Sequence, residues 1–138
     1  MSEQQLQGKR ILLVDDDADI LTSMQAVFEP TGAAIDLANN GNKAVELFDQ
    51  NKPDLVILDM MLPGRSGFLV LEHIQREKNK AKKNRTHPPF VIMITGNTGA
   101  RHKMFAESLG VSEYFTKPVK MDKLITTGQR LLGAAPTA

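Results

Sequence analysis

Residues 53–67 are Pro-Asp-Leu-Val-Ile-Leu-Asp-Met-Met-Leu-Pro-Gly-Arg-Ser-Gly, and this stretch decides the fold. The four consecutive branched aliphatic residues at 55–58 predict a strand buried on both faces, because a half-exposed strand would alternate with polar residues. The strand ends on an acid, Asp59, and a proline and two glycines then force a tight loop. Asp59 is therefore expected at the carboxyl edge of a central sheet, where open α/β sheets bind ligands.

The composition limits the classes of protein to which this chain can belong. Its 138 residues, 41% of them hydrophobic, suit one domain with a single core. Cysteine is absent, which excludes disulfides and thiolate chemistry and fits a reducing compartment. No apolar run approaches the ~20 residues of a membrane span, and a net charge of +1 gives no general attraction to nucleic acid. We expect a cytoplasmic protein with no direct contact with nucleic acid or membrane.

The rest of the chain repeats the pattern of a strand followed by a helix. Four further apolar stretches predict strands, at residues 10–14, 34–38, 90–94 and 113–116. Apolar residues at helical spacing follow each strand. Five strands alternating with five helices predict a doubly wound α/β fold, with a parallel sheet covered on both faces. We expect this domain over residues 9–132, between a flexible N-terminal segment, 1–8, and a flexible tail, 133–138.

Chemically active side chains follow four of the predicted strands. Asp15 and Asp16 come after the first strand, Asp59 ends the third, Thr95 follows the fourth and Lys117 the fifth. Because parallel strands end at the same edge of such a sheet, these side chains are expected to converge. Three carboxylates in one place need a counter-charge, and an all-oxygen ligand set favours a hard cation, Mg²⁺ first and Mn²⁺ second.

This set of residues suits phosphoryl transfer. Asp59 is ionised at neutral pH, because the ordinary carboxyl pKa lies well below 7, and a carboxylate can attack phosphorus to form an acyl phosphate. The metal would bridge Asp59 and the phosphoryl group, while Lys117 and the Thr95 hydroxyl neutralise its remaining charge. Two further acids, Asp17 and Asp19, are interpreted as helix-start residues, since carboxylates there accept from free N–H groups.

The chain from about residue 9 to residue 132 closely resembles the receiver domain of bacterial two-component response regulators. The resemblance is carried by the acidic pair after the first strand, the spacing from Asp59 to Pro63 and Gly67, the threonine after the fourth strand, and the Lys-Pro after the fifth. It implies a flavodoxin-like fold with strand order 2-1-3-4-5, an order for which a receiver domain is a standard example.

The resemblance also implies a role for each acid. Asp59 would be the phosphoacceptor and would take its phosphoryl group from a phosphohistidine on a sensor histidine kinase or a histidine phosphotransfer protein. Asp16 would bind Mg²⁺ directly, Asp15 mostly through water, and Met61 would offer its backbone carbonyl. The protein would catalyse only its own phosphorylation and dephosphorylation, and so would not be an enzyme acting on other substrates.

Switching would depend on residues beyond the acids. Thr95 and Lys117 would contact the phosphoryl group, and Tyr114 matches the aromatic switch of the family. Their movement would reshape the surface formed by the fourth helix, fifth strand and fifth helix, which would engage a downstream protein. We expect a stand-alone receiver rather than a piece of a longer regulator, because few residues follow the domain.

Two departures from the family pattern stand out. Gly96 replaces the alanine common after the family's threonine, which is expected to leave the site open and to loosen the loop. A basic insert at residues 78–85 lengthens the link between the third helix and the fourth strand, and we expect it to affect partners rather than chemistry.

Two other interpretations account for part of the same pattern. The first is an aspartyl phosphatase resembling the haloacid dehalogenase group, with Asp15 and Asp17 as its Asp-x-Asp pair. Against it, Asp19 stands where threonine or valine is expected, and no segment could form a substrate-covering cap. The second is a degenerate receiver that only binds partners, which is disfavoured because every acidic and basic position that the chemistry needs is present.

Overall fold

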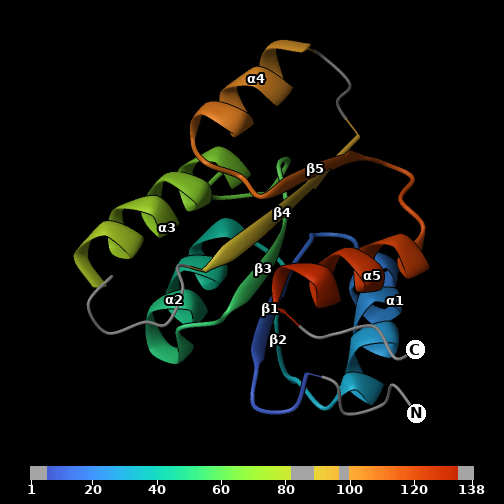
Figure 1. The fold of residues 1–138 in the computed structure, drawn as a ribbon. Helices are drawn as coiled ribbons and strands as arrows, with labels where there is room; N and C mark the ends of the chain where they lie inside the picture. Colours follow the sequence, from blue (N-terminus) through green and yellow to red (C-terminus); the bar gives the residue numbers. More distant parts are fainter. Residues whose placement is uncertain (1–5, 82–88, 97–99, 134–138) are drawn as a thin grey trace.

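The computed structural model describes residues 6–81, 89–96 and 100–133 (Figure 1). The elements in chain order are β1 (Arg10–Val14), α1 (Ala18–Phe28), the 3₁₀ helix η1 (Glu29–Thr31), β2 (Ala34–Ala38), α2 (Gly41–Asn51), β3 (Leu55–Asp59), α3 (Gly67–Ala81), β4 (Phe90–Thr95), α4 (Ala100–Ser108), β5 (Glu113–Thr116) and α5 (Met121–Leu131). The predicted alternation of strands and helices is confirmed. No helix of the described ranges is long and apolar enough to cross a membrane.

The strands form one parallel sheet in the order β2-β1-β3-β4-β5, as predicted. All five residues of β3 are buried, because this strand lies between β1 and β4 and is covered on both faces. The register pairs Val14 with Leu58 and Asp59 with Ile94, so the three central strands end at nearly the same level. This alignment brings the residues that follow β1, β3 and β4 to one edge.

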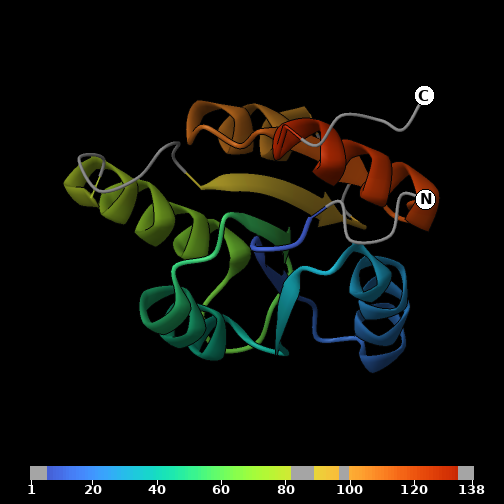
Figure 2. The ribbon, with the colours of Figure 1, turned by 60° about the horizontal axis from the view of Figure 1, so that its bottom comes forward.

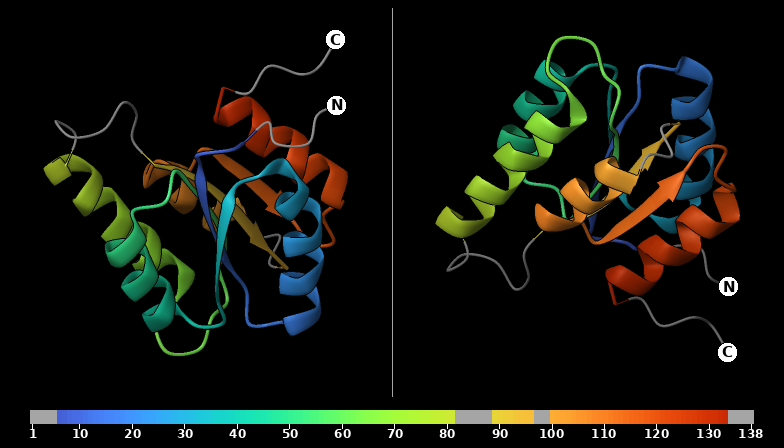
Figure 3. Two further views of the ribbon diagram at one scale, coloured as in Figure 1. Left: turned by 90° about the horizontal axis from the view of Figure 1, so that it is seen from below. Right: turned by 90° about the horizontal axis from the view of Figure 1, so that it is seen from above.

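The helices cover the two faces of the sheet unequally (Figures 2 and 3). On one face α1 and α5 bury their apolar stripes, represented by Met24, Phe28 and Leu124, against the sheet. On the other face α2 and α3 do the same, represented by Phe48 and Ile74, and α4 adds the buried Ala106, while its Met104 and Phe105 side chains stay exposed. Alternate residues of each strand enter the two cores, as expected for a doubly wound fold.

The structure describes residues 6–8 of the N-terminal segment that the sequence predicts to be flexible, and that flexibility stays a prediction. Leu6 is completely buried in the core between α1, α5 and the sheet, and its N–H donates to the carbonyl oxygen of Thr31 at 2.8 Å. Burial of a leucine side chain offsets the entropic cost of ordering this short segment. The predicted flexible ends at 1–5 and 134–138 lie outside the described residues, and the remaining domain division stays a prediction.

Candidate functional site

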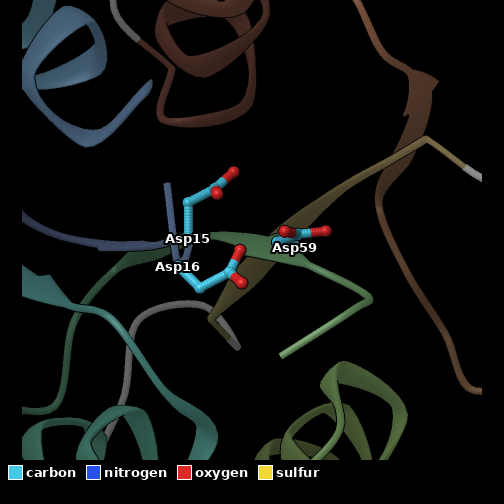
Figure 4. Close-up of side chains that lie close together, drawn as sticks. All are labelled: Asp15, Asp16 and Asp59. Carbon is cyan, nitrogen blue, oxygen red and sulfur yellow. The ribbon is translucent and has the colours of Figure 1, made fainter. Parts of the chain in front are cut away.

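Three carboxylates meet at the carboxyl edge of the sheet (Figure 4). Asp15 and Asp16 directly follow β1, and Asp59 is the last residue of β3. Ligand atoms of the three acids lie within 4.8 Å of one another; Asp15 and Asp59 are buried and Asp16 is exposed. The parallel register explains the convergence, since β1 and β3 are neighbours that end together. The predicted acidic cluster is thus present.

Lys117 supplies the positive charge at this edge. Its Nζ lies 3.1 Å from Asp15 Oδ2 and 3.2 Å from Asp59 Oδ2, so a single ammonium bridges the two buried acids. The backbone holds the lysine in place, because its N–H donates to the Thr95 carbonyl oxygen at 2.7 Å, just beyond the end of the β4–β5 pairing. Only a quarter of the Lys117 side chain is exposed, which strengthens both ion pairs.

The pKa values at the site reflect burial and crowding of charge. Burial, followed by the nearby charge of Asp15, raises the pKa of Asp59, and the opposing effects of the Met61 N–H and Lys117 do not cancel this rise. Burial lowers the pKa of Lys117, but its contacts with the two acids prevail and the pKa is raised overall. A charged Lys117 therefore lies beside Asp59, whose ionised form is less stable here than it would be in water.

The oxygen atoms of the cluster fit a hard divalent cation. Asp15 Oδ1 accepts from the Asp17 N–H at 2.9 Å, and Asp59 Oδ1 accepts from the Met61 N–H at 3.2 Å. Asp15 Oδ2 is buried and, although it is ion-paired with Lys117, receives no hydrogen bond of normal geometry from the described residues. Three carboxylates against one ammonium leave two negative charges to be balanced, and all donors are oxygen, which suits Mg²⁺.

The other predicted site residues lie on the adjoining strands and loops. Thr95 ends β4, is completely buried, and follows Ile94, the register partner of Asp59. Tyr114 lies in β5, half-buried against the core under α2, α3 and α4, and burial raises its pKa. Met61 follows Asp59 in the β3–α3 loop with a largely exposed side chain.

Asp17 and Asp19 do not join the acidic cluster. Asp17 is the N-cap of α1, where its carboxylate accepts from the N–H groups of Asp19 and Ile20, and Asp19 lies in the first helical turn. These contacts confirm that both acids act at the start of the helix.

A glycine closes the loop that follows Asp59. The N–H of Gly67 donates to the Met60 carbonyl oxygen at 2.9 Å. A Cβ at Gly67 would lie 2.3 Å from the Asp59 carbonyl oxygen and 2.6 Å from the Met60 Cα, so no larger residue fits without moving the backbone of the site. The predicted role of Gly67 in shaping the loop is in line with this close approach.

Sequence reasoning missed one contact of the same loop. The first turn of α2 packs on residues 63–65, where Gly41 approaches the backbone of Arg65 and Asn42 lies beside Gly64. A glycine at the first position of a helix was the one signal in the sequence, and it does not show which segment packs there.

The two departures from the family pattern have different outcomes. A Cβ at Gly96 would meet no atom of the described chain within 4 Å, so the space there does not require a glycine and the predicted loosening stays a prediction. Within the basic insert, residues 78–81 belong to α3, while the remainder of 78–85 lies outside the described residues.

The raised pKa of Asp59 predicts how stability depends on pH without metal. Because the folded protein holds a proton on Asp59 that the unfolded chain has released, the free energy of unfolding should increase as pH falls through the raised pKa towards the ordinary value of 3.8. At neutral pH in EDTA, Asp59→Asn should therefore melt higher than the native protein, by roughly 4 °C if the gain is ~1 kcal/mol.

Mg²⁺ is the control for this expectation. Saturating Mg²⁺ should reverse the order of the two melting temperatures, because the ion stabilises the native carboxylate cluster and loses one ligand in the variant. Melting followed by circular dichroism in EDTA and in MgCl₂ checks both statements. A variant that melts below the native protein in EDTA at pH 7 would contradict them.

Comparison with known proteins identifies the family of domains that carries this arrangement. The model of the response regulator receiver domain matches residues 11–129. Protein PilH of Pseudomonas aeruginosa is 33% identical over 118 residues, which cover 86% of this chain and 93% of PilH. The transcriptional regulatory protein DltR of Streptococcus agalactiae is 32% identical over 116 residues, which cover 84% of this chain and 48% of DltR. The chain thus spans about half the length of DltR.

Solved structures show the same fold. The receiver domain of the Francisella response regulator 1452 aligns with a TM-score of 0.78 at 27% identity, over 91% of this chain and 98% of that one. A CheY-like receiver domain protein of Methanospirillum hungatei aligns with a TM-score of 0.73 at 28% identity, over 91% of this chain and 95% of that one.

Proposed function

This chain belongs to the response regulator receiver family, a family of phosphorylation-dependent signalling switches, and we propose that Asp59 is its phosphoacceptor. The observation that carries this assignment is the contact of one lysine, Lys117, with two buried acids at the end of the central strand. In the reaction, an Asp59 oxygen forms a bond to phosphorus while the bond from phosphorus to a donor histidine nitrogen breaks. The donor is a sensor histidine kinase or a histidine phosphotransfer protein.

Each neighbour of Asp59 has a task in this reaction. Asp15, Asp16, Asp59 and the Met61 carbonyl would hold Mg²⁺, which supplies positive charge to the phosphoryl oxygens when bound. The Met61 N–H orients the Asp59 carboxylate through its hydrogen bond to Oδ1. Lys117 balances the negative charge, and its position beside Asp59 Oδ2 requires little movement to reach a phosphoryl oxygen on that carboxylate.

We assign the switch to the Thr95–Tyr114 pair and the readout to the surface of α4, β5 and α5. Thr95 and Thr116 are register partners, so a shift of the β4 end is felt directly in β5, which carries Tyr114. This surface carries charges of both signs: Lys103, Lys120 and Lys123 are exposed, as are Glu107 and Asp122, and Lys123 Nζ lies 5.5 Å from the centre of the Phe115 ring. A groove of 660 Å³ along β5 and α5 offers room for part of a protein partner.

The alternative activity of an aspartyl phosphatase gains nothing from the structure or from the relatives. Asp17, which would be its second acid, caps α1 instead of lining the cluster. The proposal therefore includes no substrate beyond the phosphoryl donor and water, and self-catalysed loss of the phosphoryl group ends the signal. A cytoplasmic location is part of the same proposal.

Tyr114 provides a direct test of the switch. It is the only tyrosine of a chain without tryptophan, so the intrinsic emission of the protein arises from this one residue. Adding beryllofluoride, a phosphoryl mimic, with Mg²⁺ should change that emission, because Tyr114 would exchange its half-buried position for another. Beryllofluoride without Mg²⁺, and Asp59→Asn with both additions, should leave it unchanged. Emission that is constant in all three samples would remove Tyr114 from the switch.

A further inference from the structure

The first residue of α2 lies directly on the loop that carries the proposed phosphoacceptor site. The Gly41 N–H donates to the Pro63 carbonyl oxygen at 3.3 Å. A Cβ at Gly41 would lie 1.8 Å from the Arg65 carbonyl oxygen and 2.6 Å from its carbonyl carbon. These are backbone atoms, so a larger residue could be accommodated only if the loop or the helix moved.

Helix α2 is well placed to hold this loop, because it is itself fixed at both ends. The Asn40 side chain caps its start by accepting from the Lys43 N–H at 2.8 Å. Near its end, Asp49 Oδ1 lies 2.7 Å from His73 Nε2 of α3. The buried Phe48 ring meets the His73 ring edge-on, with centroids 6.0 Å apart. The loop thus leads into α3 and packs on α2, and these two helices also contact each other away from the site.

Hydrogen bonds at both ends restrict the movement of the loop between β3 and α3. The Met60 N–H donates to the Ile94 carbonyl oxygen at 3.2 Å, and the Gly67 N–H returns to the Met60 carbonyl oxygen at 2.9 Å. Met61 therefore lies between Met60, which is hydrogen-bonded to β4, and residues 63–65, which pack on the first turn of α2. The Met61 N–H donates to Asp59 Oδ1, so a movement of either segment would also move this hydrogen bond.

We propose that Gly41 is a positioning residue for the cation site. By carrying no side chain, it lets residues 63–65 rest on the first turn of α2, and this contact sets where the Met61 backbone stands relative to Asp59. The inference rests on the proposed function, in which the Met61 carbonyl is a metal ligand. It adds that the geometry of the site depends on a helix that contributes no ligand of its own.

The test is Gly41→Ala in the 138-residue chain. Alanine raises helix propensity at this position, so propensity alone would stabilise α2, and any harm must come from the collision with Arg65. We expect the amide signals of Asp59, Met61 and Gly67 to shift in NMR spectra of the metal-free protein. Isothermal titration should show Mg²⁺ binding that is weaker by about tenfold or more, as for other displaced supports of metal ligands.

Ala44→Gly is the matched control. It destabilises the same helix at a buried position but adds no atom near the loop, so Mg²⁺ affinity should stay native at a temperature where all proteins are folded. Should Gly41→Ala not fold, Gly64→Ala strains the loop beside the same contact, because the φ of +76° at Gly64 disfavours any side chain and its Cβ would lie 3.2 Å from Asn42 Nδ2. The same weakening is expected there.

The outcomes separate this inference from the proposed function. Native Mg²⁺ affinity and unshifted loop amides in the folded Gly41 variant, or in the Gly64 variant if that one is used, would overturn the inference alone. Equal weakening in Ala44→Gly would also overturn it, because loss of helix stability would then suffice. A native protein that binds no Mg²⁺ would instead contradict the proposed function, whatever the loop amides show.

Discussion

Asp59→Asn should abolish the mass increase that the native protein gains from a small phosphodonor in the presence of Mg²⁺. The amide nitrogen and oxygen of asparagine lack the charge and nucleophilicity of a carboxylate, and the buried position of residue 59 admits no substitute from solvent. Intact-protein mass spectrometry after incubation with acetyl phosphate measures the result. The native protein should gain one phosphoryl group, and the gain should disappear in EDTA.

Asp17→Asn is the matched control. Asparagine is as good an N-cap as aspartate, so α1 should stay intact and phosphorylation should proceed at the native rate. An aspartyl phosphatase that used Asp15 and Asp17 would show the reverse, with loss in Asp17→Asn. If the mass increase survived in Asp59→Asn, the assignment of the phosphoacceptor would be wrong.

Among the substitutions proposed for this protein, Lys117→Met should lower the free energy of unfolding most in metal-free buffer. Methionine keeps most of the length of the side chain but leaves the buried carboxylates of Asp15 and Asp59 facing each other without the ammonium between them. Removing one partner of a buried ion pair costs about 3 kcal/mol or more, and the partial exposure of Lys117 favours the lower figure. Urea unfolding in EDTA measures this loss.

Added Mg²⁺ should recover much of that stability. The cluster then carries more uncompensated negative charge, so it should bind Mg²⁺ more tightly than the native site, and an ion bound only by the folded state stabilises it. Lys120→Met is the control, since Lys120 is exposed and makes no side-chain cap hydrogen bond at the start of α5. An equal loss for Lys117→Met in EDTA and in MgCl₂ would show that its role is packing rather than charge.

The sheet and the acidic edge were predictable because each depends on local sequence signals joined by one rule of topology. The apolar run at residues 55–58 has no polar member, which required burial on both faces, and β3 is indeed the central strand. Since parallel strands end together, residues far apart in the sequence, such as Asp16 and Lys117, could be assigned to one site without knowledge of any contact.

The remaining features depend on contacts that no local pattern encodes. Leu6 is a single leucine in a polar segment, so the sequence contains no apolar periodicity that would predict its burial. The seat that Gly41 provides for the loop depends on the distance between two backbones. Sequence reasoning placed Lys117 at the phosphoryl group, but its bridge between Asp15 and Asp59 became visible only in three dimensions.

The place of each strand in the sheet separates the fixed part of the protein from the adjustable part. Asp59 ends the innermost strand, which has a neighbour on each side, so its backbone has no direction in which to give way. Tyr114 belongs to β5, one of the two edge strands, which is only four residues long, is hydrogen-bonded along one side and has no fully buried residue. The phosphoacceptor thus lies on the most constrained strand of the sheet, and a conformational change at the edge strand β5 does not require β3 to move.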